Sequence, residues 1–363
     1  PAGPAAAARG PATLPAPLLA RADARPWPLG EADAAATLPA AAAARLAAVV
    51  DGAFAGAHGT GTRTSAVLVV HRGRIVAERY APGFGPHVPQ RTWSVAKSLT
   101  SAAIGRAAAL GLLDVDRPPA YRAGMRGDPR TAITLDQLLR MQSGLWTDGP
   151  GNRTDALYFG GATVRETALV APLEVAPGTR FRYANNDTLL AALALLPFPV
   201  LAGPPAIPAD FLETELLWPA GMTRTQVERD WQGVPVLSSQ VWMTARDMAR
   251  LALLHLNDGQ VPDGRGGKRR LLPEGWVKAA TSPVGPQPDN GLGYGRAIWL
   301  MGPAQGLPEG SFAFLGNRGQ VALVVPSADL VVVRRGVDPA GASFDAPGFA
   351  RAVIAAIGGR VRG

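Results

Sequence analysis

The chain has 363 residues, 47% of them hydrophobic and 18% charged, so it can bury a sizeable globular core as one large domain or two packed lobes. It contains no cysteine, which excludes disulfides, thiol catalysis and cysteine-ligated metals. The formal net charge is +8, but most basic residues are isolated arginines without interleaved aromatics, so we interpret the charge as surface character and predict no nucleic-acid partner.

The first part of the chain combines an irregular segment with a helix and a hairpin. Residues 1–39 are rich in Ala and Pro and are predicted to be a flexible leader. A leader of this kind is typical of an exported domain, so a periplasmic or secreted location is expected, with the cytoplasm as the alternative. A helix is predicted from residue 40 to 50, followed by β-rich runs at 65–70 and 74–80 around a turn at 71–73.

The middle of the chain is predicted to be mostly helical. Thr134 and Gln137 form a capping-box pattern, and Thr244 is placed to cap a helix. The most apolar stretch, 189–207, is interrupted by prolines, which indicates a buried helix ending in a loop and no membrane span. The helical patterns cover residues 93–112, 135–142, 185–196 and 245–256.

Strand patterns return near the end of the chain. Residues 319–325 and 329–334 predict a second hairpin, and residues 349–357 predict a terminal helix. The order of elements predicts an α+β fold in which one antiparallel sheet is flanked by helices and carries an inserted all-α lobe. The predicted units are a sheet domain (40–92 and 245–363) and a mostly helical domain (93–244).

Ser94 and Lys97 are the first candidate catalytic pair. Only three of the 36 basic residues are lysines, and Lys97 is the one in a mostly apolar segment. A lysine amine can give up its proton, which a guanidinium does not do in a protein. Spacing of i to i+3 at the start of a helix places Ser94 and Lys97 on one face, so the amine can take the serine proton. The alternative is a helix-capping serine beside a solvated lysine.

Two further segments complete the candidate site. Tyr183 stands at a turn into an apolar helix, where its phenol can relay a proton, and Asn185 can orient the lysine or a substrate carbonyl. Residues 316–320 (GNRGQ) enter a strand, where glycines allow another backbone to approach. The alternative for the first segment is that Tyr183 is structural and Asn185 caps the helix. The alternative for residues 316–320 is a β-turn without a role in the site.

Together these segments resemble the motif set of penicillin-recognising serine enzymes: S-x-x-K, Y-x-N and a Gly-rich strand in place of K-T-G. The spacing is similar to that of class C β-lactamases and their esterase and amidase relatives, with the 6-aminohexanoate-dimer hydrolase-like group the most similar. Five further segments carry the resemblance, at 138–145, 177–190, 243–250, 271–277 and 319–334.

The resemblance implies a β-lactamase/transpeptidase-like fold with the active site between two domains. It implies that Ser94 is acylated, that Lys97 activates it and that Tyr183 is the general base and later the acid. The backbone N–H groups of Ser94 and Gln320 would form the oxyanion hole, and Asn185 would position Lys97 or the substrate. No metal or organic cofactor is implied.

The chain departs from the β-lactamase pattern at the third motif. Asn317-Arg318-Gly319 stands for Lys-Thr-Gly, so the usual cation for a substrate carboxylate is missing at the first position, and Arg318 is a possible replacement. This favours simple esters or amides over penicillins. Trp146 and Tyr158 belong to a segment, 146–161, that is expected to line the cleft and contact substrate.

Other functions have less support in the sequence. A Ser-His-Asp hydrolase would have to use His58, His71, His87 or His255, and the chain has no G-x-S-x-G elbow. The chain has no H-E-x-x-H motif, so the sequence does not indicate a metallohydrolase. Residues 56–61 are Gly-rich but lack the Lys-Ser/Thr of a P-loop. A D,D-peptidase or β-lactamase is the enzymatic alternative. A binding or sensor module is the non-enzymatic one, although such a module does not need all of Ser94, Lys97 and Tyr183. The oligomeric state is left open.

Overall fold

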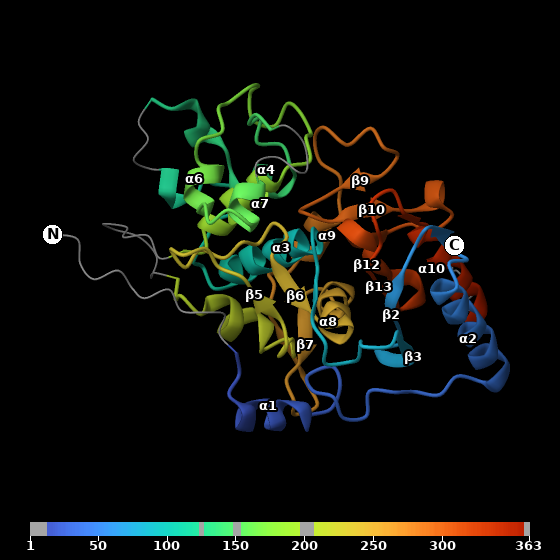
Figure 1. The fold of residues 1–363 in the computed structure, drawn as a ribbon. Coiled ribbons are helices and arrows are strands. Elements are labelled where there is room, and N and C mark those ends of the chain that lie inside the picture. The colour runs from blue at the N-terminus through green and yellow to red at the C-terminus, as the bar shows by residue number, and fades with distance from the viewer. Residues whose placement is uncertain (1–12, 123–126, 148–153, 197–206, 359–363) are drawn as a thin grey trace.

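The structure is a computed structural model that describes residues 13–122, 127–147, 154–196 and 207–358 (Figure 1). Its main sheet has seven strands in the order β3-β2-β13-β12-β11-β10-β9, and every neighbouring pair is antiparallel. The predicted hairpins are confirmed as β2–β3 and β12–β13. The strands are β2 (Thr64–His71), β3 (Arg74–Tyr80), β9 (Gly293–Tyr294), β10 (Trp299–Met301), β11 (Ser311–Gly316), β12 (Gln320–Val325) and β13 (Leu330–Gly336).

Helices cover both faces of this sheet, which explains why its central strands are continuous apolar runs and do not alternate with polar residues. Val67 and Val69, which point to the same face of β2, pack with α2 (Ala40–Phe54) and α10 (Ala346–Ala356). Leu68 and the residues on its side of the sheet belong to the other core, together with α8 (Ala245–Leu256). Figure 1 shows α2 and α10 side by side at one edge of the molecule, with α8 across the sheet from them.

The inserted lobe contains most of the remaining helices and joins the core of the sheet. Thr134 and Gln137 form the predicted capping box, and Thr244 caps α8 as predicted. One hydrophobic cluster includes Leu138 and Leu189 of the lobe as well as sheet residues, so the division into domains at residues 92/93 and 244/245 stays a prediction. The helices are α3 (Val95–Ala109), α4 (Leu135–Leu139), α5 (Thr154–Tyr158), α6 (Val164–Ala168), α7 (Asn185–Leu193) and a π-helix (Leu212–Leu217).

Short elements connect the lobe to the sheet. A three-stranded sheet of β4 (Gln90–Arg91), β6 (Val241–Met243) and β5 (Gln226–Val227) joins the chain entering the lobe to the chain leaving it. The other short elements are β1 (Gly59–Thr60), β7 (Gln260–Pro262), β8 (Lys268–Arg270), α9 (Trp276–Ala280) and β14 (Ser343–Phe344).

The prediction of a flexible leader up to residue 39 is wrong for residues 13–39. This segment forms α1 (Ala16–Asp23) and then binds the body of the protein. Arg250 of α8 donates hydrogen bonds to the carbonyl of Pro28 at 2.6 Å and ion-pairs with Glu31 at 2.8 Å. Trp27 is only 6% exposed and stacks on the Arg250 guanidinium. Composition suggested flexibility, but a buried aromatic ring and a buried ion pair hold the segment in place.

The apolar stretch predicted to be a buried helix is helical at its start. Helix α7 ends at Leu193, and residues 197–206 lie outside the described part of the chain. Within the part that the structure describes, we find no helix long and apolar enough to cross a membrane.

His255 of α8 is a buried structural residue and not a catalytic one. It is 1% exposed, its Nδ1 lies 2.9 Å from the carbonyl oxygen of Leu251, and its ring packs 4.9 Å from that of Phe314. Among the described residues its Nε2 has no hydrogen-bond partner. Burial lowers the pKa of His255 to about 4.

This burial predicts a pH-dependent stability. Between pH 6.5 and about 4 the unfolded chain binds a proton at His255 that the folded protein excludes, so the free energy of unfolding falls as the pH falls through that window. We expect His255→Leu to reduce the loss between pH 7.5 and pH 5 by about 2 kcal/mol, measured by urea unfolding at both values. His87→Leu, at an exposed position, is the control. Equal losses in wild type and His255→Leu would contradict the argument.

Candidate active site

Ser94 lies where the chain turns sharply into α3. The residue before it, Trp93, has a φ of +51°, a left-handed conformation that is uncommon for a bulky residue. Ser94 occupies the N-cap position, but its side chain makes no capping hydrogen bond. Its hydroxyl is instead the meeting point of Lys97 and Tyr183, so the interpretation of Ser94 as a capping serine is wrong.

The Lys97 amine is buried beside Ser94. Lys97 is 1% exposed, and its Nζ lies 3.2 Å from Ser94 Oγ, 2.5 Å from Asn185 Oδ1 and 2.8 Å from the carbonyl oxygen of Ser238. Burial lowers the pKa of Lys97 to about 7. The amine therefore exchanges between its charged and neutral forms near neutral pH, which is what a base for the serine proton requires.

Tyr183 approaches Ser94 from the turn before α7. It lines the cleft together with Ser94, and its ring packs against those of Trp299 at 5.4 Å and Tyr294 at 5.9 Å. Lys97 Nζ lies 5.2 Å from the centre of the same ring. Burial raises the pKa of Tyr183, and the neighbouring Ser94 hydroxyl offsets part of that rise. The phenol is therefore protonated at neutral pH.

A cleft of about 550 Å³ opens above these groups. The predicted residues Asn185, Tyr158 and Asn317 line it together with Ser94 and Tyr183. The predicted segment 146–161 also contributes Thr154, Asp155 and Phe159, and the predicted turn contributes Gly316. Sequence reasoning missed the other four residues of the lining: Trp93, Ser239, Trp299 and Leu315.

Two residues missed by the sequence analysis organise the site from the segment that returns to the sheet. The carbonyl of Ser238 accepts the Lys97 hydrogen bond, and its hydroxyl lies 2.6 Å from that of Tyr158. Ser239 accepts a hydrogen bond from Arg91. Ser238 is 141 residues from Lys97 in sequence and belongs to no local motif, so no signal in the sequence identified it.

The third predicted motif forms a tight turn, and Asn317 is the one of its three residues that lines the cleft. Strand β11 ends at Gly316, residues Asn317–Gly319 form the turn, and β12 begins at Gln320. A Cβ on Gly319 would collide with Arg334, whose guanidinium packs over Phe344 beside the core formed with α2 and α10. Arg318 is exposed, and its Nη1 donates to the carbonyl of Asp338 at 3.1 Å.

Gln320 is not part of the cleft lining, so the structure does not support its predicted role in the oxyanion hole. It is 2% exposed, its side chain donates to Gly336 and accepts from Arg335, and it pairs with Gly316 in the sheet. Gly316 is the residue that approaches the nucleophile. A Cβ there would lie 3.2 Å from the backbone nitrogen of Ser94 and 2.2 Å from the carbonyl oxygen of Thr92.

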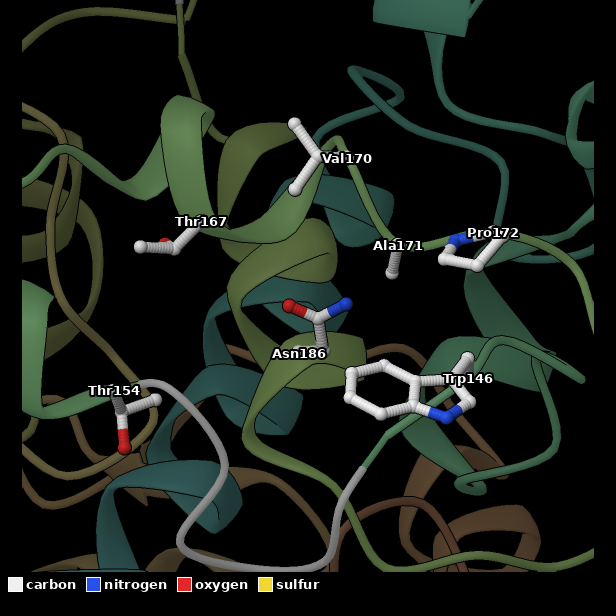
Figure 2. A pocket seen from close by; sticks show the side chains of 7 residues that line it. All are labelled: Trp146, Thr154, Thr167, Val170, Ala171, Pro172 and Asn186. Atoms are coloured by element: carbon white, nitrogen blue, oxygen red, sulfur yellow. The ribbon is translucent and has the colours of Figure 1, made fainter.

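Trp146 lies in a different cavity from Ser94. This smaller space, of about 50 Å³, is lined by Trp146, Asn186, Val170 and neighbouring side chains (Figure 2). Thr154 lines both the small cavity and the cleft. The predicted contact between Trp146 and substrate therefore has no support from the structure, and residues 148–153 of the same segment lie outside the described part of the chain.

The comparisons with known proteins agree with this geometry. The β-lactamase family model matches residues 50–334. A 6-aminohexanoate-dimer hydrolase of Paenarthrobacter ureafaciens is 26% identical over 296 residues, which are 75% of this chain and 72% of the relative. A penicillin-binding protein from Bacillus halodurans has a TM-score of 0.60 at 17% identity, covering 86% of this chain and 99% of its own. A β-lactamase from Mycobacterium bovis has a TM-score of 0.56 at 19% identity, covering 82% and 96%. The predicted β-lactamase/transpeptidase-like fold is confirmed.

Gly316→Ala tests whether the close approach of β11 to Ser94 matters. The added methyl would meet the Thr92 carbonyl at 2.2 Å, so β11 or the Ser94 turn must shift. A displacement of about 1 Å at a reacting centre costs on the order of 100-fold in rate, and we expect a loss of that size in esterase kcat/KM. Gly85→Ala, where a Cβ meets only one atom at 4.0 Å, is the matched control. Full activity of Gly316→Ala would show that the approach is not needed.

Proposed function

The chain belongs to the β-lactamase family of serine hydrolases, and we propose that it cleaves ester or short amide bonds through an acyl-enzyme on Ser94. The observation that carries the proposal is the convergence of three groups. Lys97 Nζ lies 3.2 Å from Ser94 Oγ, and the Tyr183 phenol is close enough for the same hydroxyl to lower its pKa. A nucleophile in contact with both a base and a proton donor has the parts that acyl transfer needs.

Lys97 in its neutral form is the proposed base for acylation. A neutral amine has two N–H groups and one lone pair. Asn185 Oδ1 and the Ser238 carbonyl can accept the two N–H groups, which leaves the lone pair for the Ser94 hydroxyl proton. A pKa of about 7 keeps a large share of the amine neutral at pH 7.

Tyr183 is the proposed acid in the same step. Since burial raises its pKa, the neutral phenol is its resting form, and it can donate to Ser94 Oγ while Ser94 donates to Lys97. This differs from the role implied by the family resemblance, in which Tyr183 is first a base. The difference follows from the pKa shifts, which favour the neutral form of both Lys97 and Tyr183.

The proposed reaction has two balanced halves. Ser94 Oγ forms a bond to the substrate carbonyl carbon while its proton passes to Lys97, and the alcohol or amine departs with the Tyr183 proton. The Lys97 proton then restores Tyr183. Water attacks the acyl-enzyme by the reverse route and releases the acid and free Ser94. The N–H groups of Ser94, at the start of α3, and of Asn317, in the cleft lining, are the proposed oxyanion donors.

The proposed substrates are simple esters and short linear amides. The relative from Paenarthrobacter ureafaciens is named for hydrolysis of a 6-aminohexanoate dimer, whose two units are joined by an amide. At the third motif of this chain the residue facing the cleft is Asn317, which carries no charge, so the usual lysine for a penicillin carboxylate is missing. A periplasmic or secreted location stays a prediction.

Hydrolysis of p-nitrophenyl butyrate by wild type and Ser94→Ala tests the nucleophile. We expect turnover by the wild type and a loss of at least about 1,000-fold in the variant, because the Ser94 hydroxyl is the one that the Lys97 amine contacts among the described residues. Ser343→Ala, at an exposed position of β14, is the control. Undiminished turnover by Ser94→Ala would place the active site elsewhere. If the wild type hydrolysed a chromogenic cephalosporin and not the ester, a β-lactamase would be favoured.

The pH profile tests the role of Lys97. Because the active base is the unprotonated amine, kcat/KM should rise with pH through about 7 and then level off. Lys97→Arg should be as inactive as Lys97→Ala, since a guanidinium keeps its proton. Lys278→Arg, the same change at an exposed position of α9, should retain wild-type activity. A flat profile between pH 5.5 and 8.5, or an active Lys97→Arg enzyme, would overturn this role.

A further inference from the structure

Two arginines from distant parts of the chain flank Trp93, the residue before the nucleophile. The guanidinium carbon of Arg91 lies 3.6 Å from the centre of the Trp93 ring, and that of Arg318 lies 6.0 Å from it. Trp93 lines the cleft next to Ser94. Two positive charges therefore flank the residue that precedes the reacting serine.

Arg91 is held in a fixed orientation at this position. It belongs to β4, which pairs with β6, and its Nη2 donates to the hydroxyl of Ser239 at 3.2 Å. Two further aromatic rings, those of Tyr158 and Phe159, lie 5.2 Å and 5.7 Å from its guanidinium carbon. Trp93, Ser239, Tyr158 and Phe159 all line the cleft, so the groups that position the guanidinium are groups that a substrate would touch.

Among the residues that the structure describes, no carboxylate lies within ion-pair distance of the Arg91 guanidinium. The buried arginines Arg140 and Arg250, by contrast, each contact a carboxylate at 2.8 Å. Burial lowers the pKa of Arg91, the charges of Tyr158 and Glu228 raise it, and that of Arg318 lowers it again. The Glu228 carboxylate is itself bonded to Gln240 and Trp242. A guanidinium left without an acid beside a cleft can bind an anion from outside.

We propose that Arg91 is a substrate-binding residue that receives a carboxylate, so that the enzyme prefers esters or amides carrying an anionic group near the scissile bond. The inference rests on the proposed function, since it places the carboxylate in the Ser94 cleft. A planar guanidinium stacked on Trp93 presents paired N–H donors that match the two oxygens of a carboxylate. The Ser239 hydroxyl, in the same lining, is a further donor.

Arg91 fits this role better than Arg318, the replacement expected from the sequence. Neither guanidinium is itself part of the cleft lining, but Arg91 contacts four residues that are, whereas Arg318 is exposed and donates to the Asp338 carbonyl. Asp155 lies in the lining and would repel an anion from its own position, which leaves the Arg91 side of the cleft as the favourable one. The cation that the third motif lacks is thus supplied from the strand before the nucleophile.

The test compares substrates that differ in charge alone. For the acyl side the pair is mono-p-nitrophenyl adipate and p-nitrophenyl hexanoate. For the leaving-group side it is m-carboxyphenyl butyrate and m-carbamoylphenyl butyrate. The quantity measured is the ratio of kcat/KM for the anionic ester to kcat/KM for its neutral partner. It is determined for wild type, Arg91→Gln, Arg91→Lys, Arg318→Gln and the control Arg265→Gln, an exposed arginine of the β7–β8 loop.

We expect Arg91→Gln to lower the ratio for at least one pair by about 10-fold or more, since a charge-assisted hydrogen bond is lost. Arg91→Lys should give an intermediate ratio, and it decides the question if the Gln variant does not fold. Arg318→Gln and Arg265→Gln should keep the wild-type ratio.

Other outcomes separate this inference from the proposed function. If the wild type hydrolyses these esters and both ratios are unchanged in the Arg91 variants, the inference is overturned and the proposed function stands. A fall in the ratio with Arg318→Gln and not with Arg91→Gln would move the carboxylate to Arg318 and overturn the assignment. Failure of the wild type on all four esters would overturn the proposed function and the inference with it.

Discussion

The burial of the Lys97 amine is the constraint on which the rest of the site depends. A charged or hydrogen-bonding nitrogen placed in an apolar interior is costly unless its N–H groups find acceptors. Here the acceptors are Asn185 Oδ1 and the carbonyl of Ser238, which lie 88 and 141 residues away in sequence. Helix α3, helix α7 and the segment returning to the sheet must therefore pack together to satisfy one nitrogen. The same burial that requires this packing lowers the pKa of Lys97 into the range where it can act as a base.

A second buried cation, Arg335, fixes the strands that lead into the site. Its side chain donates to Gln320 Oε1 at 2.6 Å and to the carbonyls of Met243 and Gln90 at 2.5 Å and 2.8 Å. These acceptors belong to β12, β6 and β4, and β4 continues directly into Trp93 and Ser94. Burial lowers the pKa of Arg335 to about 9, and the hydrogen bonds to neutral acceptors compensate for its lost hydration. Gln320 is thus committed to holding Arg335.

Features that depend on neighbours in sequence were predicted well. The bounds of α8 and β3 agree with the patterns for 245–256 and 74–80, and the capping box at Thr134 is present, because caps, turns and side-chain periodicity act over a few residues. The docked leader was missed for the opposite reason. Its ion pair joins Glu31 to Arg250, 219 residues away, and no local composition reports such a contact.

The sequence by itself determined the family of the protein and pointed to the candidate catalytic groups. A serine and a lysine three residues apart on one helix must share a face, and a lysine in an apolar segment of an arginine-rich chain indicates an amine that can lose its proton. Only the tertiary structure decided which backbone and side chains surround them. In the structure Gly316 and Asn317, and not Gln320, lie beside Ser94. Trp146 lines a separate cavity, and Arg91 stacks on Trp93, which lines the cleft. The physical reason is that the direction of a group at a turn or strand end depends on sheet register and on packing between segments far apart in the chain, which a linear pattern does not contain.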